Sequence, residues 1–150
     1  QEDVKAVKEM LNGKTTFTPT GERLQFYRNS LTLFSQAPVL GHGTGRFHEK
    51  YAEHVAGTKQ VVTSNPHNEY LMVGVQSGLV GLGILAALLW ALWWAAYRWE
   101  GMDRWLAQGM VVWLAGGCCV NSFFLDSREG MLFALLAGVY GAAPTAQKES

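Results

Sequence analysis

His67 stands at the most informative place in the chain for chemistry. It lies in residues 65–71 (NPHNEYL), where a polar stretch changes into a long apolar one. Asn65 is a favourable N-cap and Pro66 suits the first helical position, so the sequence predicts a helix with His67 in its first turn. The positive end of the helix dipole keeps an imidazole neutral, and a neutral imidazole can accept a proton from a hydroxyl. His67 is therefore a candidate general base at a water–lipid interface. The alternative is an ordinary polar residue beside a helix cap.

A glycine-rich turn, GHGTG at residues 41–45, precedes this segment. Alternating glycines permit left-handed backbone and close approach of a ligand, which makes Gly41 and Gly43 candidates for substrate binding. The turn lacks the features of a Walker loop or a dinucleotide fingerprint, and a plain tight turn is the alternative. Three histidines recur every six residues, a spacing that puts neighbours on different helix faces, so we expect no metal site and no cofactor. These are His42, His48 and His54.

Long apolar runs follow His67, whereas most of the charged residues come before it. Residues 71–97 carry no formal charge over about 27 positions, more than the ~20 that span a bilayer. Residues 105–125 give a second run of about 21 residues, and residues 131–143 give a shorter one of about 13. The sequence predicts an all-α, polytopic membrane protein with a helical loop region, residues 1–67, and about three transmembrane helices within residues 68–150. We place these helices at about 68–97, 105–125 and 128–144. The alternative, a buried helical hairpin of a soluble protein, is disfavoured by the length of the first apolar run.

The basic residues near the apolar runs predict the orientation. Arg98 and Arg104 flank the loop between the first two runs and Lys148 follows the third, while the loop at residues 126–129 has no positive excess. The positive-inside rule therefore places residues 1–67 outside, in the periplasm of a bacterium, and the protein in the inner membrane. The bilayer is then an expected partner. Nucleic acid is not, because the chain has zero net charge and no basic patch.

Two helices are expected in the loop region, at residues 2–11 and 21–36. The second shows an apolar stripe of Leu24, Tyr27, Leu31 and Phe34 suited to a membrane surface or to the spanning bundle.

Small residues in the spans indicate close helix packing. Gly74 and Gly78 form a G-x-x-x-G pair, and the adjacent Cys118 and Cys119 are interpreted as packing residues. The chain starts without Met or a signal sequence, although its first part must be exported. We therefore expect a C-terminal piece of a larger protein, whose remaining helices pack against these spans.

Four segments, taken in order, resemble the O-antigen ligase family. They are GERLQFYR at residues 21–28, PVLGHGTGRF at 38–47, PHNEYL at 66–71 and GLVG at 78–81. The family includes ligases that join O-antigen to the lipid A core, O-antigen polymerases and bacterial protein O-oligosaccharyltransferases. The similarity covers roughly residues 20–100 closely; Tyr27 departs from it, since relatives often carry Trp there. Family members are several times longer, which implies that this chain is the last large periplasmic loop and the final spans.

The resemblance implies a membrane glycosyltransferase, most specifically an O-antigen ligase. Its donor would be a glycan linked through diphosphate to undecaprenol, and its acceptor a hydroxyl of the lipid A core or another hydroxyl. The acceptor would attack the anomeric carbon, and undecaprenyl diphosphate would leave. The family's essential histidine matches His67, which would position or deprotonate the acceptor. Its essential arginine matches Arg23, which would bind the diphosphate in an enzyme that uses no metal.

The chemistry of the side chains agrees with these roles. A diphosphate leaving group gains negative charge in the transition state, and a guanidinium pairs well with phosphate oxygens. Arg28 and Arg46 are further candidates for phosphate or glycan contact. Without the resemblance, Arg23 would be interpreted as a solvated charge on the polar side of its helix.

Two alternatives stay open. An O-antigen polymerase or a protein O-oligosaccharyltransferase shares the chemistry but not the acceptor. A non-enzymatic membrane protein, such as a transporter subunit or an assembly factor, would tolerate loss of Arg23 and His67. Because other basic residues and the helices of a lipid groove lie elsewhere in the family, the 150 residues alone are expected to be inactive. Polar residues near the external ends of the last two spans either line the site or are solvated at the interface: Asn121, Asp126 and Glu129.

Overall fold

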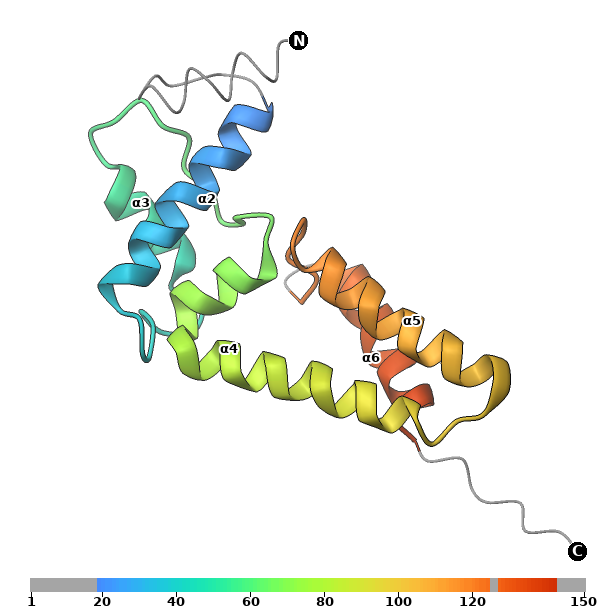
Figure 1. The fold of residues 1–150 in the computed structure, drawn as a ribbon. Coiled ribbons are helices and arrows are strands. Elements are labelled where there is room, and N and C mark those ends of the chain that lie inside the picture. Colours follow the sequence, from blue (N-terminus) through green and yellow to red (C-terminus); the bar gives the residue numbers. More distant parts are fainter. Residues whose placement is uncertain (1–18, 125–126, 143–150) are drawn as a thin grey trace, which may run out of the picture.

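The computed structural model describes residues 19–124 and 127–142 (Figure 1). Within these residues the chain is all-helical and contains no strand, which confirms the predicted all-α class. The predicted helix at residues 2–11 lies outside the described part. The helices are α2 (Pro19–Gln36), α3 (Phe47–Val55), α4 (Glu69–Ala96), α5 (Gly101–Gly117) and α6 (Ser127–Gly141).

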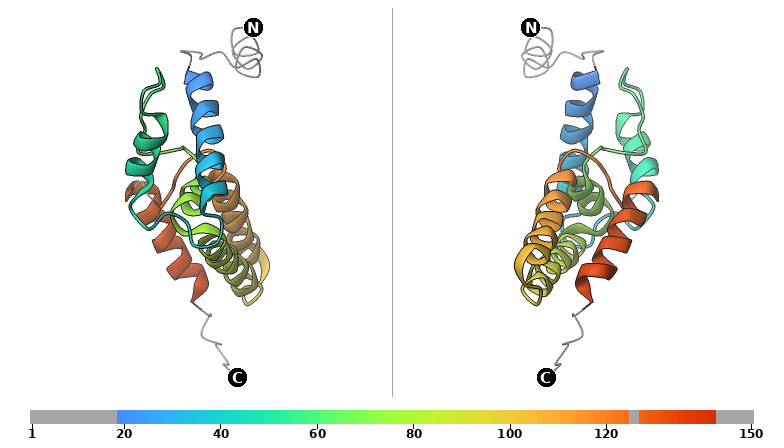
Figure 2. Two further views of the ribbon diagram at one scale, coloured as in Figure 1. Left: turned by 90° about the vertical axis from the view of Figure 1, so that its left-hand side faces the viewer. Right: turned by 90° about the vertical axis from the view of Figure 1, so that its right-hand side faces the viewer.

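The helices form two groups that share α4. Its first turns pack against α2 and α3, whereas its longer, later part runs beside α5 and α6 (Figures 1 and 2). α5 returns alongside α4, so the turn after α5 comes back to the beginning of α4 (Figure 1). Residues about 50 positions apart in the sequence therefore meet next to His67.

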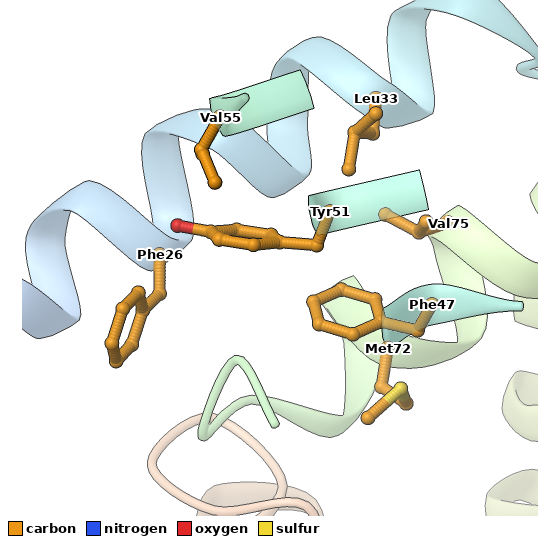
Figure 3. Close-up of a cluster of buried hydrophobic side chains, with 7 residues drawn as sticks. All are labelled: Phe26, Leu33, Phe47, Tyr51, Val55, Met72 and Val75. Atoms are coloured by element: carbon orange, nitrogen blue, oxygen red, sulfur yellow. The ribbon is translucent and has the colours of Figure 1, made fainter. Parts of the chain in front are cut away.

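The first group is held by a core of seven buried side chains from α2, α3 and α4 (Figure 3). Tyr51 of α3 is fully buried at its centre, and Phe26 of α2 meets it edge-on with ring centroids 6.0 Å apart. Burial raises the pKa of the Tyr51 hydroxyl, an effect that the hydrogen bond from Asn29 partly offsets. The other members of the core are Leu33, Phe47, Val55, Met72 and Val75.

The apolar stripe predicted for α2, which suits a membrane surface or the spanning bundle, is not the face that this structure buries most, although Phe34 packs against the first core. Leu31 is 56% exposed, and the buried face is made instead by Phe26, Asn29 and Leu33. Hydrogen bonds of a polar side chain explain why this face is buried. The Asn29 side chain donates to the Tyr51 hydroxyl at 2.9 Å and to Gln60 Oε1 at 2.6 Å. A buried amide with such partners is satisfied, but a pattern of apolar residues does not reveal it.

α4 is broken at Gly78, whose φ of 62° and ψ of −154° are not helical. An unbroken helix would pair the Leu79 N–H with the Val75 carbonyl and the Val80 N–H with the Gln76 carbonyl. The segment after α2 takes over all four groups: Leu79 and Val80 donate to the carbonyls of residues 38 and 39, and residues 42 and 43 donate to those of Val75 and Gln76. The break is therefore satisfied by backbone hydrogen bonds.

This contact revises the role predicted for the glycine pair. A Cβ on Gly74 would lie 3.3 Å from the Phe34 ring, so Gly74 does allow α2 to approach α4. A Cβ on Gly78 would lie only 2.4 Å from the Val39 carbonyl oxygen. Gly78 thus admits a loop backbone and not a neighbouring helix.

Among the described residues, α4 is the one helix that is long and apolar enough to cross a membrane. Only 11% of its most apolar 18-residue window is buried, unlike the core helix of a soluble protein. Its bounds agree with the predicted 68–97 to within a residue. α5 begins at Gly101 and ends at Gly117, so the predicted 105–125 is displaced, and α6 ends at Gly141, before the predicted 144. Both are shorter than the length of a full span, so the count of three spans stays a prediction.

The turn after α5 contributes to a second core. Cys118 is fully buried with Leu114, Phe123 and Phe133, which agrees with a packing role, whereas Cys119 is exposed. This core fixes the position of residues 118–124, which then contact the beginning of α4.

Candidate functional site

The segment that carries His67 is a hydrogen-bonded turn and not the start of a helix. The Asn65 side-chain oxygen accepts from the His67 N–H at 2.7 Å. The true N-cap of α4 is Asn68, whose side chain accepts from the Leu71 N–H at 3.0 Å. The predicted cap at Asn65 and first-turn position of His67 are therefore wrong. Because the Asn65 oxygen is already occupied inside the turn, the helix begins three residues later than a cap at Asn65 would place it.

His67 adopts a left-handed backbone conformation with φ of 54°, the only positive φ of a non-glycine residue in the described chain. Such a conformation costs of order 1 kcal/mol and persists only where surrounding contacts enforce it. Strain of this kind clusters at functional sites. The imidazole is half-buried, so it remains within reach of solvent.

Helix α2 supplies two of the contacts that enforce this conformation. The Phe26 ring stacks on the His67 ring with centroids 6.4 Å apart. The Tyr27 hydroxyl lies 3.1 Å from the His67 carbonyl oxygen and 3.0 Å from that of Cys119. The ring and the backbone of His67 are thus both held by neighbouring residues of one helix.

The turn after α5 closes the other side of the site. Glu69 donates its N–H to the Cys118 carbonyl at 2.8 Å, and the Asn68 side chain donates to the Cys119 carbonyl at 2.8 Å. The Glu69 carboxylate, only 3% exposed, accepts from the Phe124 N–H at 3.0 Å. Three separate parts of the chain therefore meet at His67.

Arg23 lies on the same helix as the residues that contact His67. It precedes Phe26 by three positions and Tyr27 by four, the spacings that place side chains on one helix face. Arg23 is exposed, and the ion pairs found in the described residues do not involve it. The geometry is compatible with a cation beside His67 that is available to a ligand.

The other predicted arginines differ from Arg23. Arg28 is exposed, and its position five residues after Arg23 places it on another face of α2. Arg46 is the N-cap residue of α3 and pairs with Glu49, with Nη2 2.5 Å and Nε 3.1 Å from the two carboxylate oxygens. The hydrogen bond from Arg46 lowers the pKa of Glu49, and the same bond raises the pKa of Arg46. A phosphate would have to compete with this carboxylate for Arg46.

The glycine-rich turn lies about two helical turns along α4 from His67, because it contacts residues 75–77. A Cβ on Gly41 would lie 2.4 Å from the Gln76 backbone, so packing alone explains this glycine. Gly43 has φ of 107°, and the Gly45 N–H donates to the Gln76 side chain. Substrate binding by Gly41 and Gly43 stays a prediction.

Two of the other histidines have ordinary structural partners. His42 Nε2 lies 2.8 Å from the Leu33 carbonyl oxygen, and His48 Nδ1 lies 3.4 Å from that of Thr63. No group of three metal-ligating side chains occurs within the described ranges.

A groove of about 660 Å³ extends from the glycine-rich turn along the broken helix. Its lining is mostly apolar, with polar groups at the end nearest the glycine-rich turn. Phe124 also lines the groove, and its N–H donates to the Glu69 carboxylate, so the groove reaches the residues that follow α5. The apolar part is lined by residues of α4 that include Val80, Ile84 and Leu88.

Comparison with known families gives a match over residues 3–86 to the family described as O-antigen ligase. The chain belongs to this family. The match includes both Arg23 and His67 as well as the broken part of α4. Members of this family are bacterial membrane proteins.

An uncharacterized protein of Haemophilus influenzae is 30% identical to the chain over 76 residues. The match covers 48% of this chain and 19% of that relative, so the chain spans about a fifth of the length of the curated relative that it matches. No solved structure shows significant similarity.

Sequence reasoning missed Glu69 as part of this site and, apart from Asn121, also the corner at residues 118–124. A carboxylate at the start of an apolar run was a usable signal for Glu69, because it needs hydrogen-bond donors there. No sequence signal pairs it with Phe124, 55 residues away. Asn121 lies in the corner and is half-buried, whereas Asp126 and the side chain of Glu129 lie outside the described part.

Proposed function

We propose that the parent protein of this chain transfers a glycan from undecaprenyl diphosphate to an acceptor hydroxyl, most specifically as an O-antigen ligase acting on the lipid A core. The observation that carries the proposal is the packing of the Arg23-bearing face of α2 onto the strained His67, within the segment matched to the family. The proposal includes three transmembrane helices in the inner membrane and residues 1–67 in the periplasm.

In the proposed reaction, the His67 imidazole accepts the proton of the acceptor hydroxyl as its oxygen attacks the anomeric carbon. The bond from that carbon to the diphosphate oxygen breaks, and undecaprenyl diphosphate leaves with the bonding electron pair. Arg23 stabilises the charge that develops on the leaving group, since a guanidinium matches phosphate oxygens in charge and geometry. The half-buried imidazole of His67 and the exposed Arg23, one helical turn before the residues of α2 that contact His67, support this division of roles.

The groove along α4 supports a lipid-linked donor. An isoprenoid chain is apolar and flexible, and the lining of the groove is apolar except near the glycine-rich turn. The remaining helices of the parent protein would complete the walls.

Arg23→Ala is expected to abolish O-antigen attachment by the full-length protein in a bacterial strain lacking its own O-antigen ligase. The wild type should restore the lipopolysaccharide ladder on a gel, and Arg98→Ala is the matched control, because Arg98 is an exposed arginine at the opposite end of α4. A ladder with Arg23→Ala at matched expression would contradict the role of Arg23. If even the wild type gives no ladder, the acceptor is not the lipid A core, and polymer formation and protein glycosylation are the assays that follow.

A further inference from the structure

Both backbone groups of His67 are hydrogen-bonded to side chains, one from its own turn and one from α2. The Asn65 side chain accepts from its N–H at 2.7 Å, and the Tyr27 hydroxyl lies 3.1 Å from its carbonyl oxygen. These contacts fix the two peptide planes next to a residue whose φ of 54° is otherwise unfavourable. Because the backbone sets the direction of the Cα–Cβ bond, they also fix where the side chain of His67 starts, and the stacking of Phe26 on the imidazole restricts the rotation of the ring.

The Tyr27 hydroxyl also contacts a second backbone carbonyl. It lies 3.0 Å from the Cys119 carbonyl oxygen, which also accepts from the Asn68 side chain at 2.8 Å. Its single proton is shared between the carbonyls of His67 and Cys119. The hydroxyl therefore ties His67 to the corner that follows α5, a part of the chain with its own buried core.

We propose that Tyr27 and Asn65 are positioning residues that hold the His67 imidazole in the geometry needed to meet the acceptor hydroxyl. Neither touches the reacting atoms. Each acts through one backbone group of His67, and Tyr27 also couples that group to residues 118–124. This inference rests on the proposed function of His67.

The test compares Tyr27→Phe and Asn65→Ala with wild type in the purified full-length protein. The substrates are an undecaprenyl-diphosphate-linked O-antigen unit and a lipid A core acceptor. Each variant should lower kcat by roughly tenfold or more at an unchanged acceptor KM, since misplacing a catalytic group by 1 Å costs up to about 10²-fold. The amount of folded enzyme is measured by thermal unfolding, so that kcat refers to folded protein.

Tyr70→Phe is the matched control for the lost hydroxyl. The Tyr70 hydroxyl also donates to a carbonyl of α5, that of Ala115 at 2.9 Å, but not to His67. It should keep the kcat of wild type. Equal losses in Tyr70→Phe and Tyr27→Phe, or a wild-type kcat in both Tyr27→Phe and Asn65→Ala, would overturn the inference.

His67→Gly in the same assay separates this inference from the proposed function. Transfer that survives His67→Gly contradicts the role of His67 itself. Loss of transfer in His67→Gly together with full activity of Tyr27→Phe and Asn65→Ala contradicts only the positioning role.

Discussion

His67→Gly and His67→Ala are each expected to lower the rate of glycan transfer by the full-length protein by about 10²–10⁴-fold. That range is what a positioned general base contributes, about 3–5 kcal/mol of the activation barrier. Glycine is the more informative variant, because the φ of 54° at position 67 is unfavourable for other residues and favourable for glycine. The His67→Gly protein should therefore be folded at least as stably as wild type and yet be inactive.

The measurement is the initial rate of transfer per folded enzyme, with the unfolding midpoint recorded for each variant. His48→Ala is the control, because His48 is exposed and its Nδ1 is 3.4 Å from a backbone carbonyl oxygen. Surface substitutions of this kind change the free energy of unfolding by no more than about 0.5 kcal/mol, so the rate per folded enzyme should stay that of wild type. A His67→Gly enzyme that keeps more than a tenth of the wild-type rate would rule out general-base catalysis by this residue.

Gly78→Ala is expected to prevent stable folding of the contact between α4 and the glycine-rich turn. The added Cβ would lie 2.4 Å from the Val39 carbonyl oxygen and 2.7 Å from the Gly41 nitrogen, both backbone atoms that cannot rotate away. Overpacking costs about 1–3 kcal/mol, and the positive φ adds strain of order 1–3 kcal/mol. Because protein stability is of order 5–15 kcal/mol, the variant should show a large fall in unfolding midpoint or in yield.

Substitutions at two other glycines separate the steric clash of the added Cβ from the strain of a positive φ. Gly45 has φ of 79° with open space around its Cβ position, so Gly45→Ala should show the strain alone. Gly83 lies in α4 with open space and no unusual φ, so Gly83→Ala should be neutral or stabilise by roughly 0.5–1 kcal/mol. Thermal unfolding of the three variants in one detergent gives the order. If Gly78→Ala is as stable as Gly83→Ala, the loop does not pack into the break as described.

Local sequence features determined the all-helical class and the presence of one long apolar helix after residue 67. A long charge-free apolar run can be recognised from sequence alone, because each residue adds independently to the free energy of transferring the segment out of water. The same holds for the resemblance around Arg23 and His67, which depends on residue types in order along the chain and agrees with the family match over residues 3–86.

Only the tertiary structure decided where α4 begins and where it breaks. Both Asn65 and Asn68 are good caps by residue type, and the choice fell to Asn68 because the Asn65 oxygen binds the His67 N–H. By sequence, Gly78 could equally be a packing glycine between two helices. The break at this residue follows from four backbone hydrogen bonds to residues 38–43.

The tertiary structure also decided two other features: the burial of the polar face of α2, and the contacts around His67 that bring together Tyr27, Glu69 and residues 118–124. In each case a polar group had more than one possible partner, and the partner chosen lies up to 92 residues away in the chain. A hydrogen bond depends on distance and direction in space, which the spacing of residues along a sequence does not specify.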